Sequence, residues 1–103
     1  MVGMGSVPVS LYDDGAEEAN RTRAHWALTA LEAFGKQTGQ NYSDGTLNIP
    51  DDCLVELAGD LLADIFHLAR LNDVAPEEIT TSGYSHFEEE VREEEEEREE
   101  AIG

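Results

Sequence analysis

Four side chains with metal-binding chemistry recur at helical spacing in the middle of the chain. They are separated by four, four and three positions: Glu56, Asp60, Asp64 and His67. At 3.6 residues per turn, this spacing places them along one face of a helix. Carboxylates arranged in this way could hold Mg²⁺ or Mn²⁺, because these hard cations prefer oxygen ligands. His86 and Glu90, which are four residues apart, could close such a site from a second helix.

This polar stripe also has an ordinary explanation. Any amphipathic helix needs a solvated face, and in an acidic chain that face will itself be acidic. We therefore expect no tight metal site and no cofactor, and we keep a site for Mg²⁺ or Mn²⁺ as the alternative. We expect Cys53 to be a buried or half-buried structural thiol, since no base lies near it in the sequence. No residue is predicted to be catalytic.

Acidic residues dominate the chain and are concentrated near its C-terminus. The 103 residues include 24 acidic and 6 basic side chains, a formal charge of −18 at pH 7. Such a field repels nucleic acid and anionic membranes and attracts basic surfaces. We expect a partner protein with a basic site, and no direct binding of nucleic acid. Ten glutamates are the expected partner-binding residues: Glu88, Glu89, Glu90, Glu93, Glu94, Glu95, Glu96, Glu97, Glu99 and Glu100.

Helix signals divide the chain into three helices with a segment on either side. Asp14 and Glu17 have the spacing of a capping box. Pro50 and Pro76, each followed by two acids, mark two further helix starts. The sequence therefore predicts an all-α, three-helix domain with an acidic C-terminal helical extension. The expected segments are a flexible arm over residues 1–12, a domain over 13–91 with helices at 16–34, 50–72 and from 76, and an acidic tail over 92–103.

The helix expected over residues 50–72 is the most apolar of the three. From Leu54 to Leu71, twelve of eighteen positions are Leu, Ile, Val, Phe or Ala. The apolar arc spans about 220°, which is wider than a small three-helix domain needs to bury. We therefore expect a homodimer through this helix. Within the domain we expect it to form the core hairpin with the third helix, and we expect Trp26 of the first helix to lie in the core.

The acidic tail is expected to pack against nothing. The apolar stripe of the third helix stops at Val91 and resumes only at Ala101. Glu88–Arg92 and Glu94–Arg98 are favourable pairs, each worth about 0.3–0.5 kcal/mol, but like-charge pairs at the same spacing oppose them. Negative charge at a C-terminal end is also unfavourable for the helix dipole. These features predict a helix that projects into solvent and frays.

Cysteine usage and hydropathy favour a cytoplasmic location. Cys53 is the single cysteine, so an intrachain disulfide cannot form. No stretch approaches 18 uninterrupted apolar residues, so no membrane span is expected. The acidity could then serve solubility, or adaptation to a salty cytoplasm in which self-repulsion is screened. This explanation stays open beside that of a partner-binding surface.

Two stretches carry a resemblance to known proteins. They are Trp26-Ala27 with Ala30-Leu31, Phe34 and Thr38-Gly39, and the run Asp60 to Ala69 followed by His86-Phe87-Glu88 and Glu90. Together they resemble a loose set of small, uncharacterised helical proteins from bacterial and mobile-element genomes. That resemblance implies an all-α fold and no activity.

The chain is also distantly similar to the all-α nucleotide pyrophosphohydrolases of the MazG kind. That likeness implies metal-dependent hydrolysis by residues of the stripe described above. The chain departs from the pattern in two places, since Glu56 and Asp60 are separated by three residues rather than two and no earlier Glu-x-x-Glu is present. The sequence favours a non-enzymatic acidic interaction or regulatory protein, such as a nucleic-acid mimic or inhibitor. A MazG-like hydrolase is the alternative.

Overall fold

The computed structural model describes residues 14–40 and 44–102, and contains three helices. They are α1 (Ala16–Thr38), α2 (Asp51–Leu71) and α3 (Pro76–Ile102). No strand occurs within these described residues, which confirms the predicted all-α, three-helix fold. The arm predicted over residues 1–12 lies outside the described part of the chain.

The first helix continues to Thr38, one turn past the end predicted at residue 34. Gly35 was expected to end it, but Gly35 is a buried residue inside α1. The helix ends instead at Gly39, which has a left-handed backbone (φ 83°) and whose N–H donates to the Gly35 carbonyl. A residue without a Cβ adopts this conformation without steric penalty, which is why glycine commonly ends helices in this way.

Local hydrogen bonds order the segment before α2 and the end of α2. Before the helix, the amide and hydroxyl of Thr46 both donate to Asp44 Oδ1, at 2.9 and 2.6 Å. The hydroxyl contact is the larger of the effects that lower the pKa of the exposed Asp44 carboxyl. After the helix, Asp73 takes a left-handed conformation (φ 58°). The amides of Asp73 and Val74 then donate back to the last turn of α2, in a Schellman arrangement.

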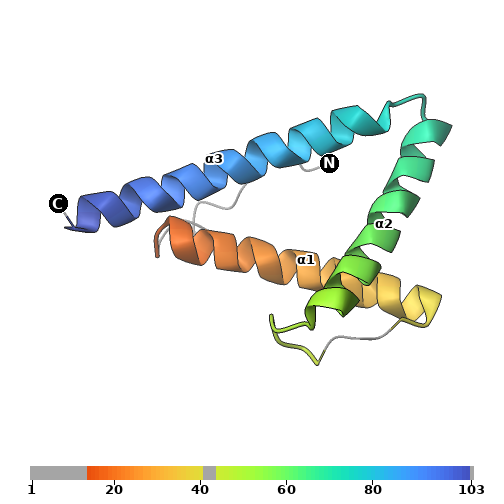
Figure 1. Cartoon of the computed structure of the whole chain (residues 1–103), viewed down its shortest axis with the longest axis horizontal. Helices are drawn as coiled ribbons and strands as arrows, with labels where there is room; N and C mark the ends of the chain where they lie inside the picture. The colour runs from red at the N-terminus through yellow and green to blue at the C-terminus, as the bar shows by residue number, and fades with distance from the viewer. Residues whose placement is uncertain (1–13, 41–43, 103) are drawn as a thin grey trace.

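The three helices enclose a triangle rather than a parallel bundle (Figure 1). α3 makes most of its contacts with α1, and α2 and α3 share the fewest contacts of any helix pair. The predicted core hairpin of the second and third helices is therefore wrong. The two helices diverge from their short connection, and the acidic half of α3 lies along the N-terminal half of α1 (Figure 1).

The buried apolar core is small. Among the described residues it consists of Ala16, Ala19, Leu28, Leu31, Leu57 and Ala69. Leu57 of α2 is the largest fully buried side chain among the described residues, at 2% exposure. Trp26, predicted to lie in the core, is 51% exposed, whereas Cys53 is half-buried as expected. None of the described helices combines the length and the apolar content that crossing a bilayer requires.

Leu57→Ala is expected to reduce the free energy of unfolding by about 2–5 kcal/mol, since it opens a cavity at the best-packed position of the core. Leu71→Ala is the matched control, because Leu71 lies on the same helix and is 81% exposed. The control should stay within about 0.5 kcal/mol of the parent chain. Urea denaturation of the three proteins at equal concentration measures the difference. Equal losses in both variants would show that Leu57 is not a core residue.

Candidate functional site

The glutamates of the second half of α3 divide into two sets according to what they contact. Glu90, Glu94 and Glu97 are spaced four and three residues apart, so they lie on one side of the helix. This side faces α1, and each of the three residues makes a polar contact with it. Most of the remaining glutamates are exposed to solvent. Glu97 is also exposed, but its carboxylate is bound to α1, so we take the exposed glutamates outside this set as those available to a partner.

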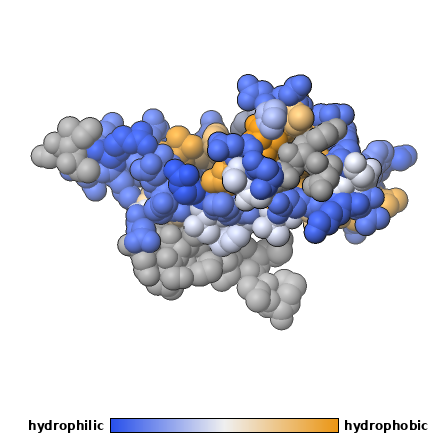
Figure 2. Space-filling model, turned by 90° about the horizontal axis from the view of Figure 1, so that it is seen from below, coloured by the Kyte–Doolittle hydropathy of each residue, from blue (hydrophilic) through white to orange (hydrophobic). Residues whose placement is uncertain are grey.

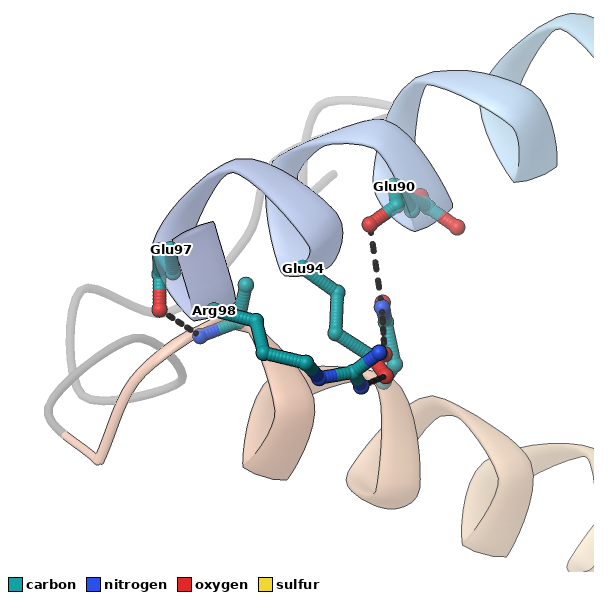
Figure 3. A network of polar contacts seen from close by, with 6 residues as sticks. Glu90, Glu94, Glu97 and Arg98 are labelled. Atoms are coloured by element: carbon teal, nitrogen blue, oxygen red, sulfur yellow. Dashed lines mark hydrogen bonds and ion pairs between the residues drawn. The ribbon is translucent and has the colours of Figure 1, made fainter. Parts of the chain in front are cut away.

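Glu97 satisfies the first backbone amide of α1. Its Oε1 accepts a hydrogen bond from the Ala16 N–H at 2.9 Å (Figure 3). The residue before the helix is Gly15, which has a left-handed φ of 94° and provides no side-chain cap. A Cβ at Gly15 would lie 3.0 Å from the same Glu97 oxygen. The predicted capping box with Asp14 is therefore wrong, because a carboxylate 81 residues away in sequence supplies the cap.

Asn20 and Arg23 of α1 bind the other two inward glutamates. Asn20 Nδ2 donates to the Glu90 carbonyl at 3.0 Å and to Glu94 Oε1 at 2.9 Å. Arg23 lies 3.3 Å from Glu90 Oε2, with both side chains largely shielded from solvent (20% and 27% exposed). Arg98 pairs with the second Glu94 oxygen at 2.9 Å (Figure 3). Glu94 is thereby held between the two helices by donors from both.

The pairing of residue 16 with 97, 20 with 94 and 23 with 90 makes α1 and α3 antiparallel. The positive end of the α1 dipole, where the first amides lack acceptors within the helix, therefore lies beside the negative end of α3. This positive end offsets the unfavourable effect that the glutamates have on the dipole of α3 itself. The prediction that the tail packs against nothing is consequently wrong, and α3 continues as a helix to Ile102.

The opposite side of α3 carries the exposed carboxylates. Six of these glutamates form what we call the outer acidic face: Glu88, Glu89, Glu95, Glu96, Glu99 and Glu100. Arg92 is paired with Glu89 at 3.0 Å, so it neutralises one charge of this face. Glu93 is half-buried. Of the ten glutamates predicted to bind a partner, three are engaged with α1 and six form the outer acidic face.

The predicted metal ligands are not brought together. Asp60 accepts a hydrogen bond from Gln40 Nε2 at 2.7 Å, and Glu56, Asp64 and His67 are exposed along the same helix. His86 lines a shallow pocket with Glu77 and Glu78, while Glu90 faces Arg23. Within residues 14–40 and 44–102, no three His, Cys, Asp or Glu side chains form a group that could hold a metal ion.

Asn20 and Arg23 are the site residues that the sequence analysis missed. They follow Ala16 at spacings of four and three, and α3 repeats this spacing at Glu90, Glu94 and Glu97. Two polar residues on the buried side of an expected helix, opposite a run of glutamates with matching spacing, were the available signal.

Comparison with known proteins finds no family model, no curated protein and no solved structure that matches this chain.

Glu97→Ala is expected to lower the free energy of unfolding by about 1 kcal/mol, the usual effect of removing a helix cap. The matched control is Glu99→Ala, which removes the same charge from the outer acidic face. It should change stability by less than about 0.5 kcal/mol. Thermal melts followed by circular dichroism compare the two variants. A Glu97→Ala protein as stable as Glu99→Ala would show that the cap contributes nothing.

Proposed function

We propose that this protein is a non-enzymatic, acidic interaction protein whose outer acidic face binds a basic site on a protein partner. The observation that supports this proposal is a row of exposed carboxylates on a helix whose opposite side is fixed to α1. The row needs no rearrangement of α3 before it can bind, so little entropy is lost in ordering the helix.

The mean density of charge along this face is similar to that of a nucleic-acid strand. Glu88 to Glu100 spans twelve residues, or about 18 Å of helix at 1.5 Å per residue. Six glutamates less the paired Arg92 leave five net charges, one per about 3.6 Å. Phosphates along one DNA strand recur about every 3.4 Å. The mean charge density is therefore close to that of one DNA strand, although the charges are grouped as Glu88–Glu89, Glu95–Glu96 and Glu99–Glu100 rather than evenly spaced. This density supports the proposal of a nucleic-acid mimic.

The metal-dependent alternative is not favoured by any observation here. It needs the stripe on α2 to converge with ligands from α3, but His86 lines a pocket with Glu77 and Glu78, and Glu90 is paired with Arg23. The stripe is nonetheless useful as a control. Its three carboxylates, Glu56, Asp60 and Asp64, equal in number the three outer-face glutamates Glu88, Glu95 and Glu99, and they lie on a different helix.

The proposal is tested by displacing an arginine-rich peptide from a fluorescently labelled DNA duplex. The parent chain is expected to release the duplex by binding the peptide. Replacing Glu88, Glu95 and Glu99 by Gln should raise the protein concentration that releases half of the duplex by about ten-fold, equivalent to about 1.4 kcal/mol. Replacing Glu56, Asp60 and Asp64 by the corresponding amides makes the same change in net charge. This control should shift the concentration by less than about three-fold.

Two results would contradict the proposal. One is an equal loss of duplex release in both triple variants. That result would mean that the peptide responds to the net charge of the chain and not to the outer acidic face, as expected if the acidity serves salt adaptation. The other is failure of the parent chain to release the duplex at any concentration. Circular dichroism of each variant is the control that tests whether its helices are retained.

A further inference from the structure

α2 and α3 leave an apolar groove open between them. It has a volume of about 350 Å³ and is lined by Leu62, Ile79, Thr80, Gly83, Tyr84 and Phe87. Three of these side chains are large, apolar and exposed: Leu62 by 43%, Tyr84 by 69% and Phe87 by 60%. Figure 2 shows that, on the face seen from below, small apolar areas lie between mostly hydrophilic side chains. An exposed apolar groove in so polar a chain indicates a surface that a partner covers.

Apolar surface continues along the side of α2 that carries Leu62. Val55 is 73% exposed and lies two helical turns before Leu62 on this side, whereas Leu54 and Leu68 are turned by about 80° and 120° away from it. Together with Leu62, Tyr84 and Phe87, Val55 exposes about 370 Å², at about 150 Å² per large apolar side chain. Each partner in a standard interface loses about 800 Å², and homodimer interfaces are about 65% apolar. The exposed apolar area is therefore about 70% of the roughly 520 Å² of apolar surface that one side of such a dimer buries.

The charge distribution identifies a second copy as the occupant. No Asp, Glu, Lys or Arg lines the groove, and residues 79–87 contain none, in a chain of charge −18. A basic partner would be attracted to the carboxylates and would find no charge to pair with in the groove. Two copies that meet over the groove would place no carboxylate among its lining residues. An apolar surface that meets itself also satisfies the two-fold symmetry of most dimers.

We propose that the chain forms a homodimer through the groove between α2 and α3, with Leu62, Tyr84 and Phe87 at its centre. The small core agrees with this arrangement, because the six buried apolar residues include three alanines. The inference does not rest on the proposed function. The two also respond oppositely to salt: screening should strengthen association between two acidic chains and weaken binding of a basic partner.

Gly83 allows a test that leaves the monomer intact. A Cβ built on Gly83 meets nothing within 4 Å, so Gly83→Glu introduces no clash within the chain and replaces glycine by a better helix former. It places a charge in the groove. Ser85→Glu is the matched control, since it adds the same charge two residues away on the opposite side of α3, outside the groove.

Light scattering and thermal melts over a range of micromolar concentrations measure the outcome. The parent chain is expected to show twice its 11.3 kDa mass and a Tm that rises with concentration. Gly83→Glu should raise the dimer Kd by at least about ten-fold, and Ser85→Glu by less than about three-fold.

Two results would overturn the dimer. One is a monomer mass for the parent chain at every concentration, with a constant Tm, which would leave the groove to a different partner or to none. The other is equal behaviour of the two glutamate variants, which would place any association elsewhere on the surface. Higher salt should tighten association of the parent chain, and a weaker dimer in high salt would also contradict the apolar interface.

Discussion

Polar contact between α1 and α3 is the interaction on which the rest of the structure depends. Three glutamates of α3 reach the first two turns of α1, where they meet an unpaired amide, an amide side chain and an arginine. Ion pairs at a surface contribute little, but these contacts are partly shielded and act on a helix end whose dipole favours negative charge. They fix α3 in an antiparallel arrangement with α1. That arrangement determines which glutamates face solvent and separates α3 from α2.

The two proposed surfaces are consequences of this arrangement. Because one side of the acidic helix is held by α1, the other side forms a fixed row of carboxylates. Because α3 follows α1 rather than α2, the apolar arc of α2 is only partly covered and an uncharged groove stays open beside it. The chain thus has a charged surface on the outer side of α3 and an apolar groove between α2 and the first half of α3. Salt should weaken the first interaction and strengthen the second.

The sequence was sufficient for elements whose signals are local. Proline followed by acids located the starts of α2 and α3 closely, and hydrophobic periodicity gave the three-helix class. It was insufficient where a distant group replaces a local one. Asp14 was expected to cap α1, but Glu97 does so, and no pattern within one helix records a partner on another. The pairing of α3 with α1 was missed for the same reason: amphipathicity identifies a face to be covered, but not the element that covers it. Trp26 was misplaced because apolar character alone does not decide burial when the core is small.

Native-state hydrogen exchange along α3 tests the central claim most directly, because it reports local opening residue by residue. If Glu90, Glu94 and Glu97 hold α3 against α1, amide protection should continue past Val91 as far as about Glu97 and then fall. Protection in this segment should drop in Glu97→Ala and persist in Glu99→Ala. A free acidic arm would instead exchange at the rate of unstructured peptide from Arg92 onward, in the parent chain as in both variants. That result would contradict the account.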